Sequence, residues 1–132
     1  MLLQIDHHSG IPIYRQVMSQ IRRLITSGQL ACGDKLESVR DLSLRLKVNP
    51  MTISKAYSFL EMEGLLERRR GLGQFVAEIP NDQKQRLKQE MLDDILNKAA
   101  ALGIQFDMSF EQLMARFEKH YHDINQKTGS RP

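Results

Sequence analysis

The chain contains 132 residues, of which 41% are apolar and 27% are charged, and its formal net charge is +3. A chain of this length accommodates one compact domain with a small appendage. No segment approaches the roughly 18 consecutive apolar residues of a membrane helix. The amino terminus lacks the charged region and the apolar core of a secretion signal, so we expect a cytoplasmic protein without a membrane partner. The single cysteine, Cys32, excludes an internal disulfide bond.

The excess positive charge lies entirely in the first part of the chain. Residues 1–79 hold 11 Lys/Arg and 8 Asp/Glu, whereas residues 80–132 hold 8 of each. The excess is modest, and its strongest local concentration is the run Arg68 to Arg70. Concentrated positive charge of this kind is typical of a surface that meets nucleic acid.

A first helix is predicted to begin at Pro12 and to end at Gly28. Its apolar residues recur at helical spacing, so we expect this stripe to form the core beneath the elements that follow. The stripe comprises Tyr14, Val17, Met18, Ile21, Leu24 and Ile25. Gly33 and Asp34 then predict a turn. Lys35 to Glu37 is a candidate short strand beside the later hairpin.

Two short helices joined by a tight turn come next. Ser38 is a favoured N-cap residue, and Asp41 three positions later completes a capping-box pattern. Lys47 to Asn49 is too short and polar to be more than a turn. Asn49 is again a helix cap, and Pro50 occupies the first helical position, where its missing amide costs nothing. The pattern therefore predicts a helix-turn-helix.

The second of these helices has two distinct faces. Ile53, Ala56, Tyr57 and Leu60 cluster on one side at about 100° per residue. The opposite side carries Met51, Ser54, Lys55, Ser58 and Met62. Small, polar or flexible side chains of this kind suit a helix that enters the DNA major groove, where short groups approach base edges. An ordinary solvent-exposed face would have a similar composition.

A basic hairpin is predicted after this helix. Gly64 ends the helix, and Leu65 starts a strand. Arg68, Arg69 and Arg70 follow, and the tip contains Gly71 and Gly73. Such concentrated charge beside a groove-entering helix suits phosphate neutralisation or insertion into a minor groove.

These residues resemble the winged helix-turn-helix of the GntR family of bacterial transcription regulators, from about Ile11 to Val76. The likeness lies in PIYRQV, NPMTISKAY and RRGLGQFV, and the second of these segments is most similar to the YtrA subfamily. The resemblance implies a dimeric regulator that binds double-stranded DNA and controls transporter genes. It also implies DNA contacts from the start of each helix of the helix-turn-helix and from the wing tip. The implied residues are Arg40, Asn49, Thr52, Ser54, Lys55, Arg70, Gly71 and Gly73.

One residue departs from the family pattern. Where the family has Leu-Pro-Ser before the first helix of the motif, this chain has Leu36-Glu37-Ser38. Loss of the proline is expected to loosen the start of that helix slightly. It also brings a carboxylate near the expected position of DNA phosphates, which would affect DNA affinity more than function.

Residues 80–132 show helical periodicity without strand signals, so we expect residues 1–79 to form the DNA-binding domain and residues 80–132 a helical dimerisation segment. One helix is predicted from Asp82 to Leu102 and is ended by Gly103. The next opens with a capping box formed by Ser109 and Gln112. Gln126 to Pro132 is predicted to be a frayed polar end.

Each of these two helices carries an apolar stripe. Two amphipathic helices without a third partner cannot bury both stripes, so a second copy of the chain is their natural cover. The alternative is that both stripes pack on the DNA-binding domain of the same chain. The predicted interface residues are Leu92, Ile95, Ala99, Leu102, Phe110, Leu113, Phe117 and Tyr121. The predicted fold is thus mainly α with a small β-hairpin, a winged helix-turn-helix followed by two dimerisation helices.

No enzyme signature is present, since the chain lacks G-x-S-x-G, a phosphate-binding loop and HExxH. His120 and His122 lie about 200° apart around a helix, so they cannot hold one ion from the same face. We expect no metal and no cofactor. A small-molecule effector would have to bind at the dimer seam or between domains, because two helices cannot enclose a metabolite pocket in one protomer.

The sequence therefore indicates a homodimeric transcription repressor that binds a two-fold symmetric operator. A rival from another class is a winged-helix protein-interaction module, in which the arginine hairpin docks on an acidic partner. A third alternative is an enzyme built around Cys32 or the histidines. Steep salt dependence of binding to random duplex DNA would separate the first two.

Overall fold

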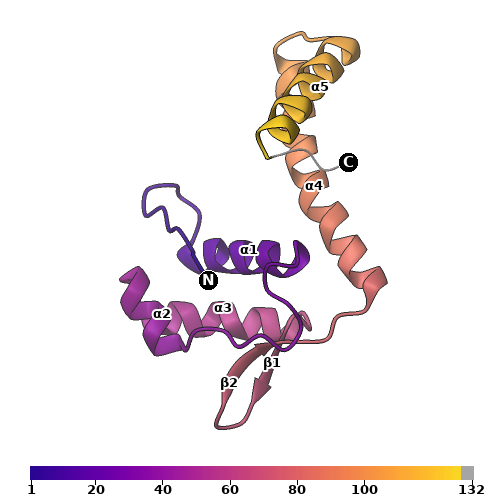
Figure 1. Cartoon of the computed structure of the whole chain (residues 1–132). Helices are drawn as coiled ribbons and strands as arrows, with labels where there is room; N and C mark the ends of the chain where they lie inside the picture. The colour runs from indigo at the N-terminus through magenta and orange to yellow at the C-terminus, as the bar shows by residue number, and fades with distance from the viewer. Residues whose placement is uncertain (129–132) are drawn as a thin grey trace. The chain divides into compact units, whose positions relative to one another are not determined.

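The computed structural model describes residues 1–128, and the chain divides into two compact units, residues 1–87 and residues 88–132 (Figure 1). The division falls inside a helix, because Leu87 still packs against the core of the first unit. Ile79, where the sequence predicts the functional boundary, is buried in that same core. As a boundary between DNA binding and dimerisation, Ile79 stays a prediction.

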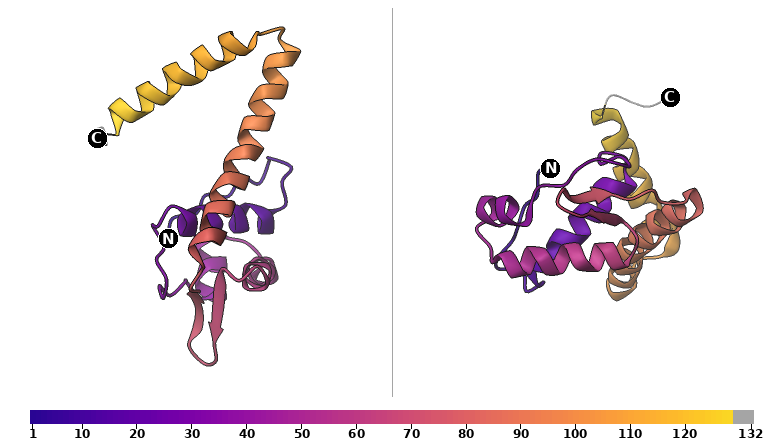
Figure 2. Two further views of the ribbon diagram at one scale, coloured as in Figure 1. Left: turned by 90° about the vertical axis from the view of Figure 1, so that its right-hand side faces the viewer. Right: turned by 90° about the horizontal axis from the view of Figure 1, so that it is seen from below.

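The first unit contains three helices and one two-stranded antiparallel sheet, in the order expected for a winged helix-turn-helix. These elements are α1 (Ile13–Thr26), α2 (Val39–Leu46), α3 (Pro50–Met62), β1 (Leu66–Arg69) and β2 (Gly73–Val76). The hairpin formed by β1 and β2 extends past α3, with its tip directed away from the helices (Figures 1 and 2). The predicted fold class, mainly α with a small hairpin, is confirmed.

Local capping explains where α2 and α3 begin. The Ser38 hydroxyl accepts a hydrogen bond from the Asp41 amide at 3.0 Å, and the Asn49 side chain accepts one from the Met51 amide at 2.8 Å. Each bond satisfies an amide that has no partner within the helix. Between the two helices, Lys47 adopts a left-handed conformation with φ of 57°. The predicted helix-turn-helix and its two caps are therefore confirmed, although at Ser38 only the hydroxyl half of the expected capping box is seen.

The core of the first unit lies between α1 and the helix-turn-helix. Buried side chains of α1 meet the buried face of α3. They are Val17, Ile21 and Ile25 from α1, and Ile53, Ala56, Tyr57 and Leu60 from α3. An ion pair of 2.6 Å between Arg22 and Glu63 also joins these helices. The predicted core faces are confirmed, and the opposite face of α3 is turned away from this core.

A third segment runs beside the wing, as the sequence suggests, but it is shorter than a strand. Lys35 forms a single antiparallel bridge with Phe75 of β2. The Leu36 amide donates to the carbonyl of Gln74, and the Val76 amide donates to that of Asp34. The wing is thereby fastened to the chain that leads into α2.

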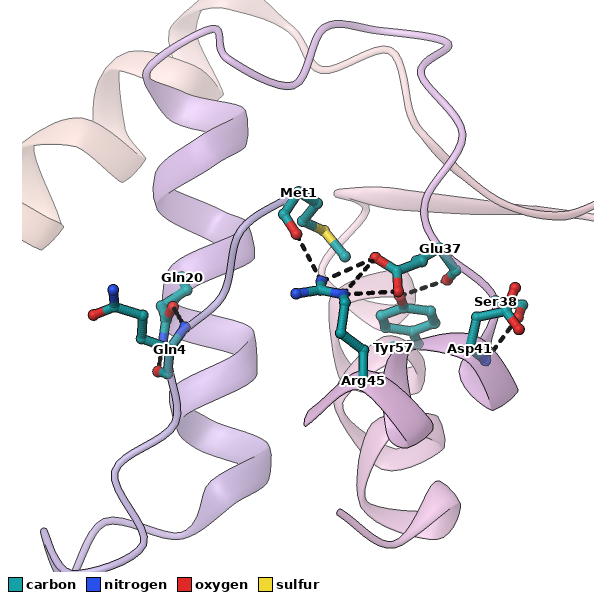
Figure 3. Close-up of polar contacts among 8 residues, drawn as sticks. All are labelled: Met1, Gln4, Gln20, Glu37, Ser38, Asp41, Arg45 and Tyr57. Atoms are coloured by element: carbon teal, nitrogen blue, oxygen red, sulfur yellow. Dashed lines mark hydrogen bonds and ion pairs between the residues drawn. The ribbon is translucent and has the colours of Figure 1, made fainter. Parts of the chain in front are cut away.

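The N-terminal segment is held along α1 by two glutamines one turn apart. Gln16 accepts from the amide of Asp6 and donates to its carbonyl, both at 2.8 Å. Gln20 exchanges the same pair of hydrogen bonds with Gln4 (Figure 3). Leu3, the residue before Gln4, is buried in the core. No periodicity in the sequence indicates this arrangement, because the segment forms no regular element.

The second unit is a helical hairpin formed by most of α4 (Asn81–Gln105) and by α5 (Phe110–Lys127). The predicted end of α4 at Gly103 is wrong, because the helix continues for two residues beyond it. Gly103 is buried, and a Cβ atom there would lie 2.6 Å from Cδ2 of Leu113 in α5. This glycine lets the two helices approach closely, and the turn itself is made by Asp107 with φ of 58°.

The start of α5 agrees with the predicted capping box. The Ser109 hydroxyl accepts from the Gln112 amide at 3.1 Å, and the Gln112 side chain accepts from the Ser109 amide at 2.8 Å. The helix runs to Lys127, so the first residues of the predicted frayed end are helical. Residues 129–132, where the rest of that prediction falls, lie outside the described residues. In the described part of the chain, no helix is both long and apolar enough to cross a membrane.

Candidate DNA-binding interface

The outward face of α3 is the first component of the candidate interface. Met51 is 74% exposed at the start of the helix, and Ser54 and Ser58 are half-buried along the same side. Thr52, also implied by the family resemblance, is half-buried next to Met51. Met62, at the other end of this face, is 81% exposed. The face thus offers hydroxyl groups and two flexible apolar side chains, which are suitable partners for base edges and thymine methyl groups.

Asn49 already has a structural role at the start of α3. Its Oδ1 atom accepts the hydrogen bond that caps the helix, and its carbonyl accepts from the Thr52 amide at 2.9 Å. Its side-chain NH2 group remains a donor. Asn49 can therefore cap α3 and present a donor at the helix start at the same time.

Lys55 lies against α1 rather than pointing straight outward. Its Nζ atom is 4.0 Å from the centroid of the Tyr14 ring and 6.0 Å from that of Phe59. The two rings pack with centroids 5.8 Å apart. A hydrogen bond from Arg15 lowers the pKa of the Tyr14 hydroxyl. Lys55 would have to leave the Tyr14 ring to reach a base, and loss of this cation–π contact opposes that movement.

The three arginines of the wing occupy different environments. Arg68 forms an ion pair of 3.5 Å with Glu61 of α3, and the guanidinium of Arg69 lies 4.2 Å from the centroid of the Phe75 ring. Successive residues of a strand point to opposite faces, which explains why neighbours find such different partners. Arg70 is exposed in the turn after β1. In the sequence these three arginines form one run of positive charge, whereas in the fold each of them has a different environment.

Glu61 also contacts Gln74, which lies opposite Arg68 in the hairpin register. The side-chain amide of Gln74 donates to Glu61 at 3.5 Å, and its Oε1 atom is buried without a hydrogen-bond partner within residues 1–128. The contacts of Glu61 with Arg68 and Gln74 therefore join α3 to the core-facing side of the wing.

Lys35 is a further cation beside the wing, and it is not among the DNA contacts that the sequence predicts. A Cβ atom built on Gly73 would lie 3.5 Å from Lys35 Cε, so the lysine side chain runs alongside the first residue of β2. The sequence indicates Lys35 to Glu37 as a candidate strand beside the hairpin. Only the pairing of this segment with β2 shows that the Lys35 side chain lies near the wing tip.

Glu37, which departs from the family pattern, is held by an ion pair and a backbone hydrogen bond. Its carboxylate pairs with Arg45 of α2 at 2.9 Å, and the same arginine donates to the carbonyl of Met1 at 2.7 Å (Figure 3). The Glu37 carbonyl accepts from the Tyr57 hydroxyl at 2.7 Å. These contacts join the segment before α2 to α2, to α3 and to the N-terminus. The expected loosening stays a prediction. Arg40, the predicted contact in the first turn of α2, is exposed.

The histidines near the end of α5 form only pairwise contacts. His122 lies 3.9 Å from Glu118, and His120 lies 3.4 Å from Arg116. Within residues 1–128, no three His, Cys, Asp or Glu side chains are grouped to hold a metal ion. Cys32 is exposed.

A helix-turn-helix with an outward α3 face and a cationic two-stranded wing defines a winged-helix DNA-binding protein. Residues 13–76 match the family described as bacterial regulatory proteins, gntR family. The chain is 36% identical over 114 residues to the HTH-type transcriptional repressor YtrA of Bacillus subtilis (strain 168), covering 83% of this chain and 88% of that protein. It is 40% identical over 99 residues to the HTH-type transcriptional regulator YhcF of the same organism, covering 73% and 82% respectively.

A solved structure extends the comparison beyond residues 13–76. A GntR family transcriptional regulator from Listeria monocytogenes superposes with a TM-score of 0.76 at 30% identity, covering 87% of this chain and 98% of that one. The chain therefore belongs to the GntR family of bacterial regulatory proteins, as its sequence motifs predict. Its relatives are transcription regulators, and DNA-binding regulation of transcription is the function that fold and family support.

Proposed function

We propose that this protein is a transcription repressor that binds a two-fold symmetric operator as a homodimer. In this proposal, α3 reads bases in the major groove and the wing contacts the neighbouring backbone and minor groove. The bases are read by Asn49, Thr52, Ser54 and Lys55, while Arg40 and the wing residues bind phosphates. The wing residues are Arg68, Arg69, Arg70, Gly71 and Gly73.

The DNA-contact proposal rests on a helix face with hydroxyl groups lying beside a cationic hairpin. Base edges require close approach by short donors and acceptors, which Ser54 and Thr52 offer. Phosphates require positive charge at the rim, which the wing supplies through Arg69, Arg70 and Lys35. The function thus rests on one face of the first unit.

Exposure of the second unit supports the dimer. Among residues 88–128, only Gly103 is fully buried, although the two helices carry many large apolar side chains. Leu102 and Phe117, for example, are 50% and 52% exposed. A helical hairpin with so little buried apolar surface gains stability from a further partner, and a second copy provides one of matching chemistry. The proposed interface comprises Leu92, Ile95, Ala99, Leu102, Phe110, Leu113, Phe117 and Tyr121.

The proposals that the protein represses transcription and that it controls particular genes rest on its similarity to relatives. The Bacillus subtilis relative YtrA is named a repressor, and its match covers most of both chains. Resemblance to the YtrA subfamily implies transporter genes as the target. We therefore propose repression of transporter genes, with promoter occupancy and transcript levels in a deletion strain as the direct test.

DNA binding is tested by titrating the full chain against random duplex DNA at several salt concentrations. A winged-helix DNA-binding protein should lose affinity steeply, because each neutralised phosphate releases counterions with a slope of about −0.9 in log–log form. A duplex affinity that is negligible at low salt, together with tight binding to an acidic polypeptide, would favour the protein-interaction module instead.

The dimer is tested by placing charge on its proposed interface. We expect the double variant Leu102→Glu and Phe117→Glu to sediment as a monomer and to lose most operator affinity, since the two half-sites are no longer linked. Leu113 is unsuitable for this variant because it packs on Gly103. Leu2→Glu is a matched control, since Leu2 is an exposed apolar residue of the first unit. A monomer with full operator affinity would overturn the symmetric mechanism, and a surviving dimer would move the interface elsewhere.

Operator symmetry is tested by measuring how DNA affinity depends on the spacing of the two half-sites. Half-sites should lie roughly 10 base pairs apart, centre to centre, or a simple multiple of that spacing. Inserting half a helical turn between them should abolish joint binding, whereas a full turn should restore part of it.

A further inference from the structure

Leu72 is a large apolar side chain at the tip of the wing, and it is 60% exposed. The hairpin closes with Arg69 opposite Gly73, which leaves Arg70, Gly71 and Leu72 in the turn. The Leu72 amide donates to the carbonyl of Arg69 at 2.9 Å, so the backbone that carries the side chain is fixed. The turn therefore presents the Leu72 side chain to solvent from an ordered backbone.

The two residues that flank Leu72 keep the tip narrow. Gly71 and Gly73 have φ values of 75° and 108°, in the region that favours glycine. Neither has a side chain, so Leu72 is the only side chain between them. A minor groove is only about 6 Å wide, and a single side chain on a two-stranded ribbon is of a size to enter it.

Three cations come from positions adjoining this apolar tip. Arg70 precedes the glycine, Arg69 is held over the Phe75 ring below it, and Lys35 runs along Gly73 from the adjoining segment. A side chain that unstacks bases needs such anchors, because phosphate contacts must offset the cost of unstacking a base step. An exposed apolar side chain next to several cations therefore suits binding to a bent duplex better than binding to a flat acidic protein surface.

We propose that Leu72 is a wedge that enters the minor groove and partly unstacks one base step, which bends the DNA toward the major groove. This inference rests on the proposed function, because it requires the wing to lie on DNA. It assigns to Leu72 a role in specificity that needs no hydrogen bond to a base. Flexible pyrimidine–purine steps unstack most readily, so the operator contains TA or CA/TG where the wing tip lies.

The test uses the full chain and a duplex that the wild-type protein selects from a random-sequence pool. Bending is measured by energy transfer between dyes on the duplex ends, and affinity is measured at several salt concentrations. Leu72→Ala removes the wedge, Leu72→Asn keeps its approximate shape but makes it polar, and Leu72→Met keeps it long and apolar. Because Leu72 is exposed, each variant should keep the wild-type thermal unfolding midpoint, which is checked first.

We expect Leu72→Ala and Leu72→Asn to reduce the bend by at least about 20° and to weaken binding about tenfold, while Leu72→Met resembles the wild type. The salt slope should stay unchanged in all three, because the phosphate contacts come from other residues. Replacing the flexible step by a stiff A-tract step should weaken wild-type binding but have little further effect on Leu72→Ala.

Other results overturn the wedge. If Leu72→Ala bends the duplex as the wild type does, Leu72 does not unstack bases. If its affinity falls together with the salt slope, the residue only positions the neighbouring cations. If the wild-type protein selects no duplex at all, the proposed function fails first, and that failure is distinct from a bound duplex that stays straight.

Discussion

The carboxylate of Glu37 is held by two nitrogens of Arg45, Nε at 3.0 Å and Nη2 at 2.9 Å. The same Nη2 donates to the carbonyl of Met1, so one guanidinium joins the end of α2, the segment before α2 and the N-terminus (Figure 3). At the position of Glu37 the family resemblance implies a proline. In this chain an ion pair with Arg45 holds the segment instead, so Arg45 should be required there.

Replacing Glu37 by alanine should therefore loosen the N-terminal segment. Both side chains are roughly a third exposed, so solvent screening keeps the expected loss in the free energy of unfolding to about 0.5 to 1 kcal/mol. Urea denaturation measures this loss, and limited proteolysis should show earlier cleavage before α1. Glu78→Ala is the control, because Glu78 is exposed and makes no ion pair in the described part of the chain. Equal stability of the two variants would contradict the role of the pair.

Tyr57 should make stability depend on alkaline pH. Burial raises the pKa of its hydroxyl above the usual value of 10.0, and the nearby charge of Glu37 raises it further. The folded state therefore keeps the phenol protonated while the unfolded state ionises. Its contribution is fully present below about pH 10 and is lost as the pH rises toward the folded-state pKa.

This contribution is measured by comparing the wild type with Tyr57→Phe. Above pH 10, the free energy of unfolding of the wild type should fall more steeply, by up to about 1.4 kcal/mol per pH unit. Tyr57→Phe should lack this additional slope, although it also loses the hydrogen bond to the Glu37 carbonyl. Parallel pH profiles for the two proteins would show that the Tyr57 hydroxyl is not protected by burial.

Cations at the wing should differ in their effect on the salt dependence of DNA binding. Lys35→Ala and Arg70→Ala should each lower the log–log salt slope by about 1, as expected for one lost phosphate contact. Arg68→Ala should lower it less, because Glu61 competes with phosphate for that guanidinium. Lys98, which pairs with Asp94 in α4, provides the control variant. An unchanged slope for Lys35→Ala would remove this residue from the interface.

Base preference should depend on the outward face of α3. Ser54→Ala or Lys55→Ala should alter the preference at one or two operator positions, with a cost on the order of 1 to 3 kcal/mol for a lost base contact. For Lys55 the effect should grow in a Tyr14→Leu background, because the lysine is then released from the ring. Selection from a randomised site measures both. If neither variant changes the preferred bases, another element reads the sequence.

Gly103 should be required for the close packing of α4 on α5. Gly103→Ala gains helix propensity, yet the new methyl group would lie 2.8 Å from Cγ of Leu113. We expect a net loss of about 1 to 3 kcal/mol from overpacking. The second change Leu113→Ala should recover part of it by making room. Hydrogen exchange of α5 amides reports the effect directly, and greater protection in Gly103→Ala would contradict it.

Local signals determined the elements of this protein. Ser38, Asn49 and Ser109 cap helices through bonds to amides two or three residues away, so their effect is visible in the sequence alone. The periodicities of α1 and α3 likewise predicted which faces are buried, because an amphipathic helix has only one way to hide its apolar side.

The tertiary structure decided what depends on residues far apart in the chain. Gly103 resembled a helix terminator, and only the position of Leu113 shows that it is a packing contact. Arg68 and Arg69 resembled equal phosphate ligands until Glu61 and Phe75 separated them. These assignments require the register of β1 on β2 and the packing of one helix on another. Such long-range contacts produce no periodic pattern in the sequence. The partners of these residues are therefore fixed only by the packing of the elements in the folded chain.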